Sequence, residues 1–145
     1  MISKKQRFEL NLMARISFLV VVAVFFAAGC TTIKEKIRLA DFEKVSRAYE
    51  HVMLNSDFES AYAFTNPDVV RSKTDFTAYE DIKIIEYQVK NGQTSRDKDE
   101  VNQTVKIKYY KNASPTVRTM RYEQLWKYDD VKKTWLLQTG LPEFK

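Results

Sequence analysis

Residues 101–109 read VNQTVKIKY. Polar and apolar side chains alternate along it, as they do in a β-strand that buries one face and exposes the other to solvent. The apolar positions are Val101, Val105, Ile107 and Tyr109. The stretch therefore predicts a half-buried strand.

Two more strands are predicted downstream. A turn over residues 112–115 leads to a long strand over residues 117–128. A connection over residues 129–134 then leads to a last strand over residues 135–139. The sequence therefore predicts an antiparallel meander that runs to the C-terminal end.

One more strand is predicted upstream, over residues 82–89. Its apolar positions are 82 and 84 and then 85, 87 and 89. This change of phase predicts a β-bulge near Ile84 and Ile85. After the strand, Asn91-Gly92 predicts a turn, followed by a long polar loop up to Glu100 with a mobile tip.

The part of the chain before residue 81 has helical periodicity. Thr32-Ile33-Lys34-Glu35 predicts a capping box, in which the Thr32 hydroxyl accepts a hydrogen bond from a first-turn amide. Apolar side chains then recur at helical spacing until Asn55. They are Ile37, Phe42, Val45, Tyr49, Val52 and Met53. We expect one amphipathic helix here, with Glu43 and Arg47 paired on its solvent face.

A second, shorter helix is predicted over residues 58–64. Asp57 caps this helix, and Asn66-Pro67 ends it. We expect irregular structure over residues 67–81, with a helical turn at Pro67 and another after Thr74. Helices followed by an antiparallel meander define the α+β class, with N-terminal helices packed on a curved antiparallel sheet.

The order of these elements resembles the NTF2-like (SnoaL-like) superfamily of cone-shaped α+β domains. The resemblance covers residues 33–140. It rests on a helix, a short helix and long strands that end in Trp126-Lys127-Tyr128 and Trp135-Leu136-Leu137. A cystatin-like domain, with one helix on a four-stranded sheet, is the nearest alternative. The second helix separates the two, because a cystatin-like fold does not need it.

The first thirty residues have the order of a secretory signal. Basic side chains come first, and an apolar run over residues 16–28 follows. The basic residues are Lys4, Lys5, Arg7 and Arg15. The apolar run is shorter than the about 20 residues that a transmembrane helix needs. It ends in Ala27-Ala28-Gly29-Cys30, which resembles the lipobox of bacterial lipoproteins. The resemblance implies transfer of a diacylglycerol group to the Cys30 thiol and cleavage before Cys30.

This interpretation divides the chain into a signal peptide over residues 1–29, a lipidated tether over 30–32 and one α+β domain over 33–145. Met13 offers an alternative start of translation. Thr31 is not the Asp that retains lipoproteins in the inner membrane of enteric bacteria. The resemblance therefore implies a cell-envelope protein anchored in the membrane through Cys30, at the periplasmic face of the outer membrane where the host has two membranes.

Charge argues against a nucleic-acid partner. The net charge is +5, but residues 1–29 hold four of the 24 Lys and Arg residues and one of the 19 Asp and Glu residues. The remainder therefore carries only about +2. Acidic and basic residues are interleaved, as in Arg96-Asp97-Lys98-Asp99-Glu100, without the one-signed tract that binds a phosphate backbone. No metal or cofactor is predicted, because His51 is the only histidine and falls on the charged face of the first helix.

Glu86 is the side chain most suited to catalysis. It shares strand parity with Ile82 and Ile84, which places it on the inner face of the sheet. Burial there raises the pKa of a carboxyl group, as the resemblance to enzymes such as ketosteroid isomerase implies. Because of the bulge, an orientation toward solvent beside Lys83 is the alternative. No second acid or base converges on Glu86, so no catalytic residue is assigned.

An aromatic row on the long strand is the candidate ligand-lining wall. It comprises Tyr122, Gln124 and Trp126, with Tyr128 beyond them. The alternative, which we favour, is that these side chains are core beneath the first helix, because a small domain must bury most of its large apolar groups.

The leading functional hypothesis is a lipid-anchored envelope protein whose domain binds a partner protein or a small apolar ligand without catalysis. One alternative is an NTF2-like isomerase, dehydratase or hydrolase that uses Glu86 and Tyr122. The other is a purely structural subunit of an envelope complex.

Overall fold

A computed structural model describes residues 33–68 and 75–145. The chain divides into two compact units, Met1–Ile37 and Arg38–Lys145. Of the first unit, residues 33–37 are described, and they are helical. Thr32, the lipobox and the signal peptide lie outside the described residues.

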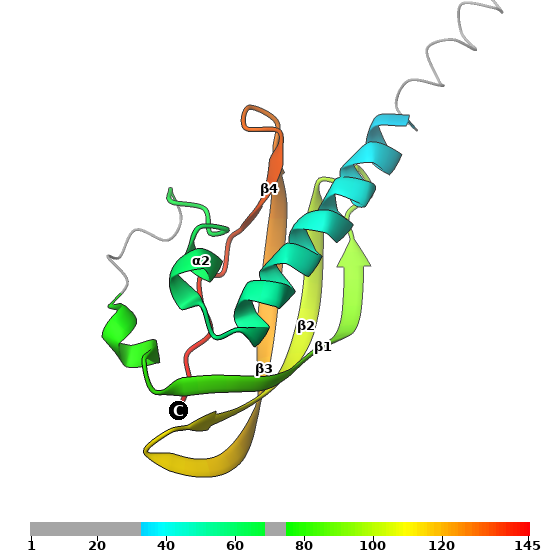
Figure 1. Ribbon diagram of the computed structural model, residues 1–145. Coiled ribbons are helices and arrows are strands. Elements are labelled where there is room, and N and C mark those ends of the chain that lie inside the picture. The colour runs from blue at the N-terminus through cyan, green and yellow to red at the C-terminus, as the bar shows by residue number, and fades with distance from the viewer. Residues whose placement is uncertain (1–32, 69–74) are drawn as a thin grey trace, which may run out of the picture. The chain divides into compact units, whose positions relative to one another are not determined.

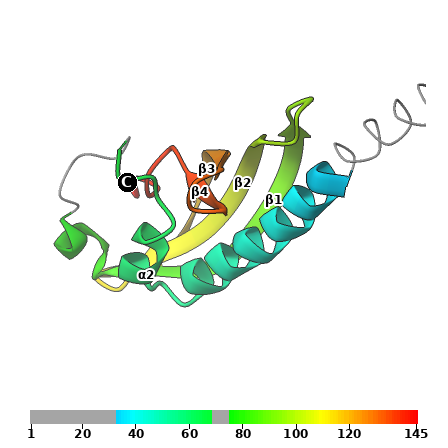
Figure 2. The same ribbon diagram turned by 90° about the horizontal axis from the view of Figure 1, so that it is seen from above.

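The second unit has the predicted α+β architecture, in which the N-terminal helix packs on a four-stranded antiparallel sheet (Figures 1 and 2). In this unit the helix continues to residue 54 and lies across one face of the sheet. The strands lie in the order in which they occur along the chain. They are β1 (Ile82–Thr94), β2 (Glu100–Lys111), β3 (Ser114–Asp129) and β4 (Thr134–Leu137).

From Phe42 onward the helix buries the predicted apolar stripe, whereas Ile37, its first predicted member, is exposed. Tyr49 and Met53 are fully buried. The side chains that pack around them at the edge of the core are Phe42, Val45 and Val52. On the solvent face, the predicted pair between Arg47 and Glu43 is present at 3.3 Å. The periodicity of the sequence therefore gave the correct orientation of this helix.

Ser56 joins the end of the helix to the sheet. Its φ of 56° is left-handed and ends the helical path. Its Oγ accepts a hydrogen bond of 3.0 Å from the backbone N–H of Ile84 at the start of β1. The predicted cap follows directly, because Asp57 accepts a hydrogen bond from the Ser60 amide at the first turn of α2 (Phe58–Tyr62).

The segment after α2 borders the short strand β4. The Asn66 amide donates to the Leu137 carbonyl at 2.8 Å, and the Leu137 amide donates to the Phe64 carbonyl at 2.8 Å. Further along, the predicted helical turn after Thr74 is the 3-10 helix η1 (Phe76–Tyr79). Residues 67 and 68 form a turn, and the rest of the predicted irregular segment before residue 75 lies outside the described residues.

The predicted turn at Asn91-Gly92 is wrong. Both residues lie within β1, with Asn91 opposite Thr104 and Gly92 opposite Gln103. Pairing with β2 overrides the local turn signal, and a bulge between Val89 and Asn91 takes up the irregularity. The connection is therefore shorter than predicted and covers residues 95–99.

A serine hydroxyl holds this short connection. Ser95 Oγ donates to Asp99 Oδ1 at 2.7 Å and accepts from the Asp99 and Glu100 amides at 3.2 and 3.1 Å. The other hairpins lie close to their predicted places. β3 begins somewhat earlier than predicted, and β4 ends two residues before Thr139.

The predicted bulge near Ile84 and Ile85 is confirmed, because the register of β1 against β2 shifts between Ile84 and Glu86. Ile84 is buried, Ile85 is half exposed, and Tyr87 is buried again. Ile85 is therefore the extra residue, and the strand resumes its alternation one position later.

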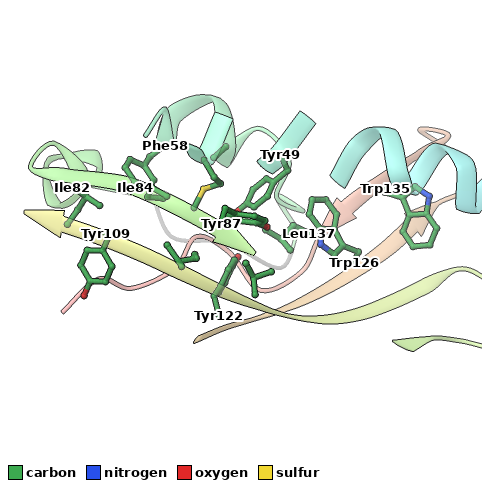
Figure 3. Close-up of a cluster of buried hydrophobic side chains, with 14 of the residues drawn as sticks. Tyr49, Phe58, Ile82, Ile84, Tyr87, Tyr109, Tyr122, Trp126, Trp135 and Leu137 are labelled. Atoms are coloured by element: carbon green, nitrogen blue, oxygen red, sulfur yellow. The ribbon is translucent and has the colours of Figure 1, made fainter. Parts of the chain in front are cut away.

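The core lies between the helix and the inner face of the sheet (Figure 3). Facing positions of β2 and β3 form its floor, with Val105 opposite Tyr122 and Val101 opposite Trp126. Trp126 is fully buried and packs edge-on against Tyr49, with the ring centroids 5.3 Å apart. The aromatic row of β3 is thus part of the core, as the favoured interpretation predicted.

Candidate binding site

Gln124 is the centre of a buried polar network on the inner face of β3. Its Oε1 accepts hydrogen bonds from Gln103 Nε2 at 2.6 Å and from Trp126 Nε1 at 3.1 Å. Its Nε2 donates to the Tyr87 hydroxyl at 2.8 Å. A buried amide needs such partners, because an unpaired one loses its bonds to water without replacement. The structure therefore brings the predicted residues Gln124 and Trp126 into direct contact.

Tyr122, the third predicted residue of the row, lies on the same face. Its hydroxyl donates to the carbonyl of Gly140 in the segment after β4. Figure 3 shows Tyr122 below Tyr87 and Tyr49, which comes from the helix. The Tyr49 hydroxyl is fully buried and makes no direct hydrogen bond to a described residue, but it lies near enough to the Tyr122 hydroxyl for the two groups to affect each other's pKa.

Of the four buried tyrosines among the described residues, three belong to this cluster, namely Tyr49, Tyr87 and Tyr122, and their phenols are neutral at physiological pH. Burial is the main cause that raises the pKa of Tyr49 and of Tyr87 well above its ordinary value of 10. Burial also raises the pKa of Tyr122 to about 12. The other buried polar side chains of the described residues are Thr65, Gln103 and Gln124. This buried surface therefore offers hydrogen bonds but no group that exchanges a proton near neutral pH.

Glu86 does not join this network. The extra residue at the bulge shifts the phase, so that Glu86 pairs with Lys108 on the outer face, while Tyr87 takes the inner face. Glu86 Oε2 lies 2.7 Å from Lys108 Nζ, and its Oε1 lies 3.5 Å from Lys106 Nζ. The hydrogen bond from Lys108 is the main cause that lowers the pKa of Glu86. The inward orientation inferred from strand parity is therefore wrong.

The outer face of the sheet carries two adjoining hollows. The larger, of about 530 Å³, is basic, and we call it the basic hollow. Its lining residues are Lys90, Asn91, Thr104, Lys106, Thr119, Arg121 and Glu123. The smaller, of about 240 Å³, is rich in amides, and we call it the amide hollow. Its lining residues are Asn91, Gly92, Gln93, Asn102, Gln103, Thr104 and Glu123.

The second bulge of β1 helps to form the basic hollow. Because the register slips between Val89 and Asn91, Lys90 has no partner of its own on β2, and Lys90 and Asn91 both line the hollow. Across the strands, Thr104 Oγ1 donates to Glu123 Oε2 at 2.8 Å. This site could not be predicted from the sequence, because it depends on the register between strands that lie far apart in the chain. That register brings Lys106 opposite Arg121.

The other features considered in the sequence are His51, a metal site and membrane attachment. His51 is exposed, as predicted, and its Nε2 lies 3.2 Å from Asn55 Nδ2. Within residues 33–68 and 75–145, no group of three or more His, Cys, Asp or Glu side chains is arranged to hold a metal ion. None of the helices described has the length and apolar character needed to span a membrane. Cys30 lies outside the described residues.

Comparison with known proteins adds no relative. No model of a protein family matches this chain, and no curated protein matches it at a significant level.

Proposed function

We propose that this chain is a lipid-anchored protein of the bacterial cell envelope whose domain acts by binding and not by catalysis. The anchoring part of the proposal comes from the lipobox at Cys30 and the basic and apolar segments before it. The non-catalytic part is supported by the buried network around Gln124, which consists of amides, an indole and phenols that are neutral near pH 7. The binding part is supported by the two accessible hollows on the outer face of the sheet.

An enzymatic role receives less support from the same residues. A general acid or base at neutral pH needs a pKa near 7 and a position where substrate can reach it. Glu86 has a lowered pKa and two lysine partners, and Tyr122 has a pKa of about 12 and donates to Gly140. The two side chains lie on opposite faces of the sheet, so they cannot act on one substrate.

A small ligand inside the domain is a second candidate, favoured by the Tyr49 hydroxyl. This group lies within the core without a hydrogen-bond partner among the described residues. A mostly apolar guest with one acceptor would complete its hydrogen bonding, but the packed core would have to open to admit it, because Tyr49 lines none of the hollows described above. Native mass spectrometry of the full-length protein in detergent tests this candidate. A guest that is retained by the wild type and lost from Tyr49→Phe supports it, and identical bare masses contradict it.

Metabolic labelling tests the anchoring. A palmitate analogue should label the wild-type protein and leave Cys30→Ser unlabelled. The labelled protein should also partition into the detergent phase, because a diacylated thiol with a further chain gives stable membrane attachment. Equal labelling of both proteins, or labelling of neither, would refute the lipoprotein assignment.

A further inference from the structure

The outer face of the sheet carries an unbalanced cluster of cations. Lys106 on β2 lies directly opposite Arg121 on β3. Like charges at facing positions of an antiparallel pair repel and destabilise the sheet. Lys106 pairs with Glu86 at 3.5 Å and shares that carboxylate with Lys108, whereas Arg121 and Lys90 form no ion pair with any other described residue. The basic hollow is lined by three cations and one carboxylate, that of Glu123, which accepts a hydrogen bond from Thr104, so that an added anion would neutralise the remaining positive charge.

The amide hollow extends this surface with a different chemistry. Asn91, Thr104 and Glu123 line both hollows, so that the two are continuous. The amides beyond them, Gln93 and Asn102, each offer both a donor and an acceptor. Sugar hydroxyls also act as donors and acceptors and pair well with such groups.

We propose that the two hollows form one binding site for an acidic saccharide. The carboxylate or phosphate of the ligand lies between Lys90, Lys106 and Arg121, and the neutral sugar hydroxyls lie against the amide hollow. The size of the basic hollow falls within the range of small-molecule sites, about 300–1,000 Å³. The proposal rests on the proposed function to the extent that an envelope location gives access to acidic saccharides.

Other ligand classes fit this surface less well. A lipid chain needs an apolar pocket, and neither hollow has an apolar side chain in its lining. An acidic peptide would use the same cations, so it is one of the competing probes in the test below. A simple anion would use the cations but would leave the amide hollow unused. An acidic saccharide is the class whose charged and neutral polar groups match both hollows.

Titration calorimetry on the full-length protein in a polyoxyethylene detergent, which contains no sugar, tests the proposal. The probes are digalacturonic acid, the neutral disaccharide cellobiose, tetraglutamate and inorganic phosphate. We expect digalacturonic acid to bind, to bind more tightly than each of the other three, and to weaken as salt is raised.

Substitutions locate the site. Arg121→Gln and, independently, Lys106→Gln should weaken the binding of digalacturonic acid by about tenfold or more, because each removes a charge-assisted contact. Lys83→Gln is the matched control, since it removes one positive charge from β1 outside both hollows and should change the affinity less than about twofold. Without ligand, Arg121→Gln should leave the melting temperature unchanged or raise it, because it relieves the repulsion with Lys106.

Several results would overturn the proposal. They are no binding of digalacturonic acid, equal or tighter binding of cellobiose, tetraglutamate or phosphate, and equal losses of affinity in Arg121→Gln and Lys83→Gln. Because the calorimetry does not depend on acylation of Cys30, its failure would leave the labelling experiment intact, and the reverse also holds.

Discussion

At the residue scale, the interior depends on one amide. Gln124 uses its carbonyl oxygen twice and its nitrogen once to connect Gln103, Trp126 and Tyr87. Each bond replaces one to water that burial removes, so the network fixes the positions of four large side chains without leaving Gln124 unsatisfied. Tyr49, which packs on the same tryptophan, is the exception, because its hydroxyl is buried without a partner.

This difference predicts opposite effects for two similar substitutions. Tyr49→Phe removes an unsatisfied hydroxyl and should leave the free energy of unfolding unchanged or raise it by about 1 kcal/mol. Tyr87→Phe removes the acceptor of Gln124 Nε2 and should lower the free energy of unfolding by about 1–3 kcal/mol. Urea unfolding of both variants measures these values. A loss of more than about 1 kcal/mol in Tyr49→Phe would mean that its hydroxyl is satisfied in solution.

At the element scale, two bulges in β1 decide what the sheet exposes. The first returns Tyr87 to the core and places Glu86 outside, and the second brings Lys90 and Asn91 to the basic hollow. Near the start of β1, the Ile84 amide donates to the Ser56 hydroxyl, and this bond joins the end of the N-terminal helix to the strand.

The Ser56 contact predicts a measurable coupling between helix and sheet. Ser56→Ala leaves the Ile84 amide without its acceptor, and we expect it to lower the free energy of unfolding by about 1 kcal/mol. Ser46→Ala is the control, since Ser46 lies in the helix that ends just before Ser56 and makes no such bond to β1. Hydrogen exchange of the Ile84 amide should accelerate in Ser56→Ala only. Unchanged stability and exchange would show that the contact does not connect the two elements.

The sequence predicted the helices and strands more accurately than it predicted which side chains lie on the outer face of the sheet. Helical spacing identified Tyr49 and Met53 as core, and alternation identified the buried side of β3, because burial of one face leaves a local periodic signal. The phase slip at Ile84 located the first bulge, but it could not decide which of the neighbouring residues was extra, so Glu86 was assigned to the wrong face. Asn91-Gly92 had a turn signal that strand pairing overrode, and the basic hollow depends on pairing between distant segments.

At the scale of the whole molecule, the buried phenols make stability sensitive to high pH. Phenols ionise near pH 10 in the unfolded chain, whereas Tyr122 ionises near 12 in the folded one, and Tyr49 and Tyr87 are also shifted upward. The folded state therefore holds these protons more tightly. The stability they contribute is complete below pH 10 and is lost as pH rises through the raised pKa values.

We expect the free energy of unfolding to fall between pH 10 and pH 12, at a limiting slope of about 1.4 kcal/mol per pH unit for each buried phenol. Urea unfolding at pH 8, 10, 11 and 12 measures this slope. Tyr49→Phe removes one of these phenols and should make the slope shallower by up to about 1.4 kcal/mol per pH unit. A free energy of unfolding that stays constant from pH 10 to pH 12 would contradict the burial of these hydroxyls.

The central claim is that the mature protein begins at an acylated Cys30. Mass spectrometry of the tryptic N-terminal peptide, from protein extracted from bacterial membranes, tests this claim most directly. The predicted peptide runs from Cys30 to Lys34 and carries the added mass of a diacylglyceryl group. A peptide that begins upstream of Cys30, or one that begins at Cys30 with an unmodified thiol, would contradict it.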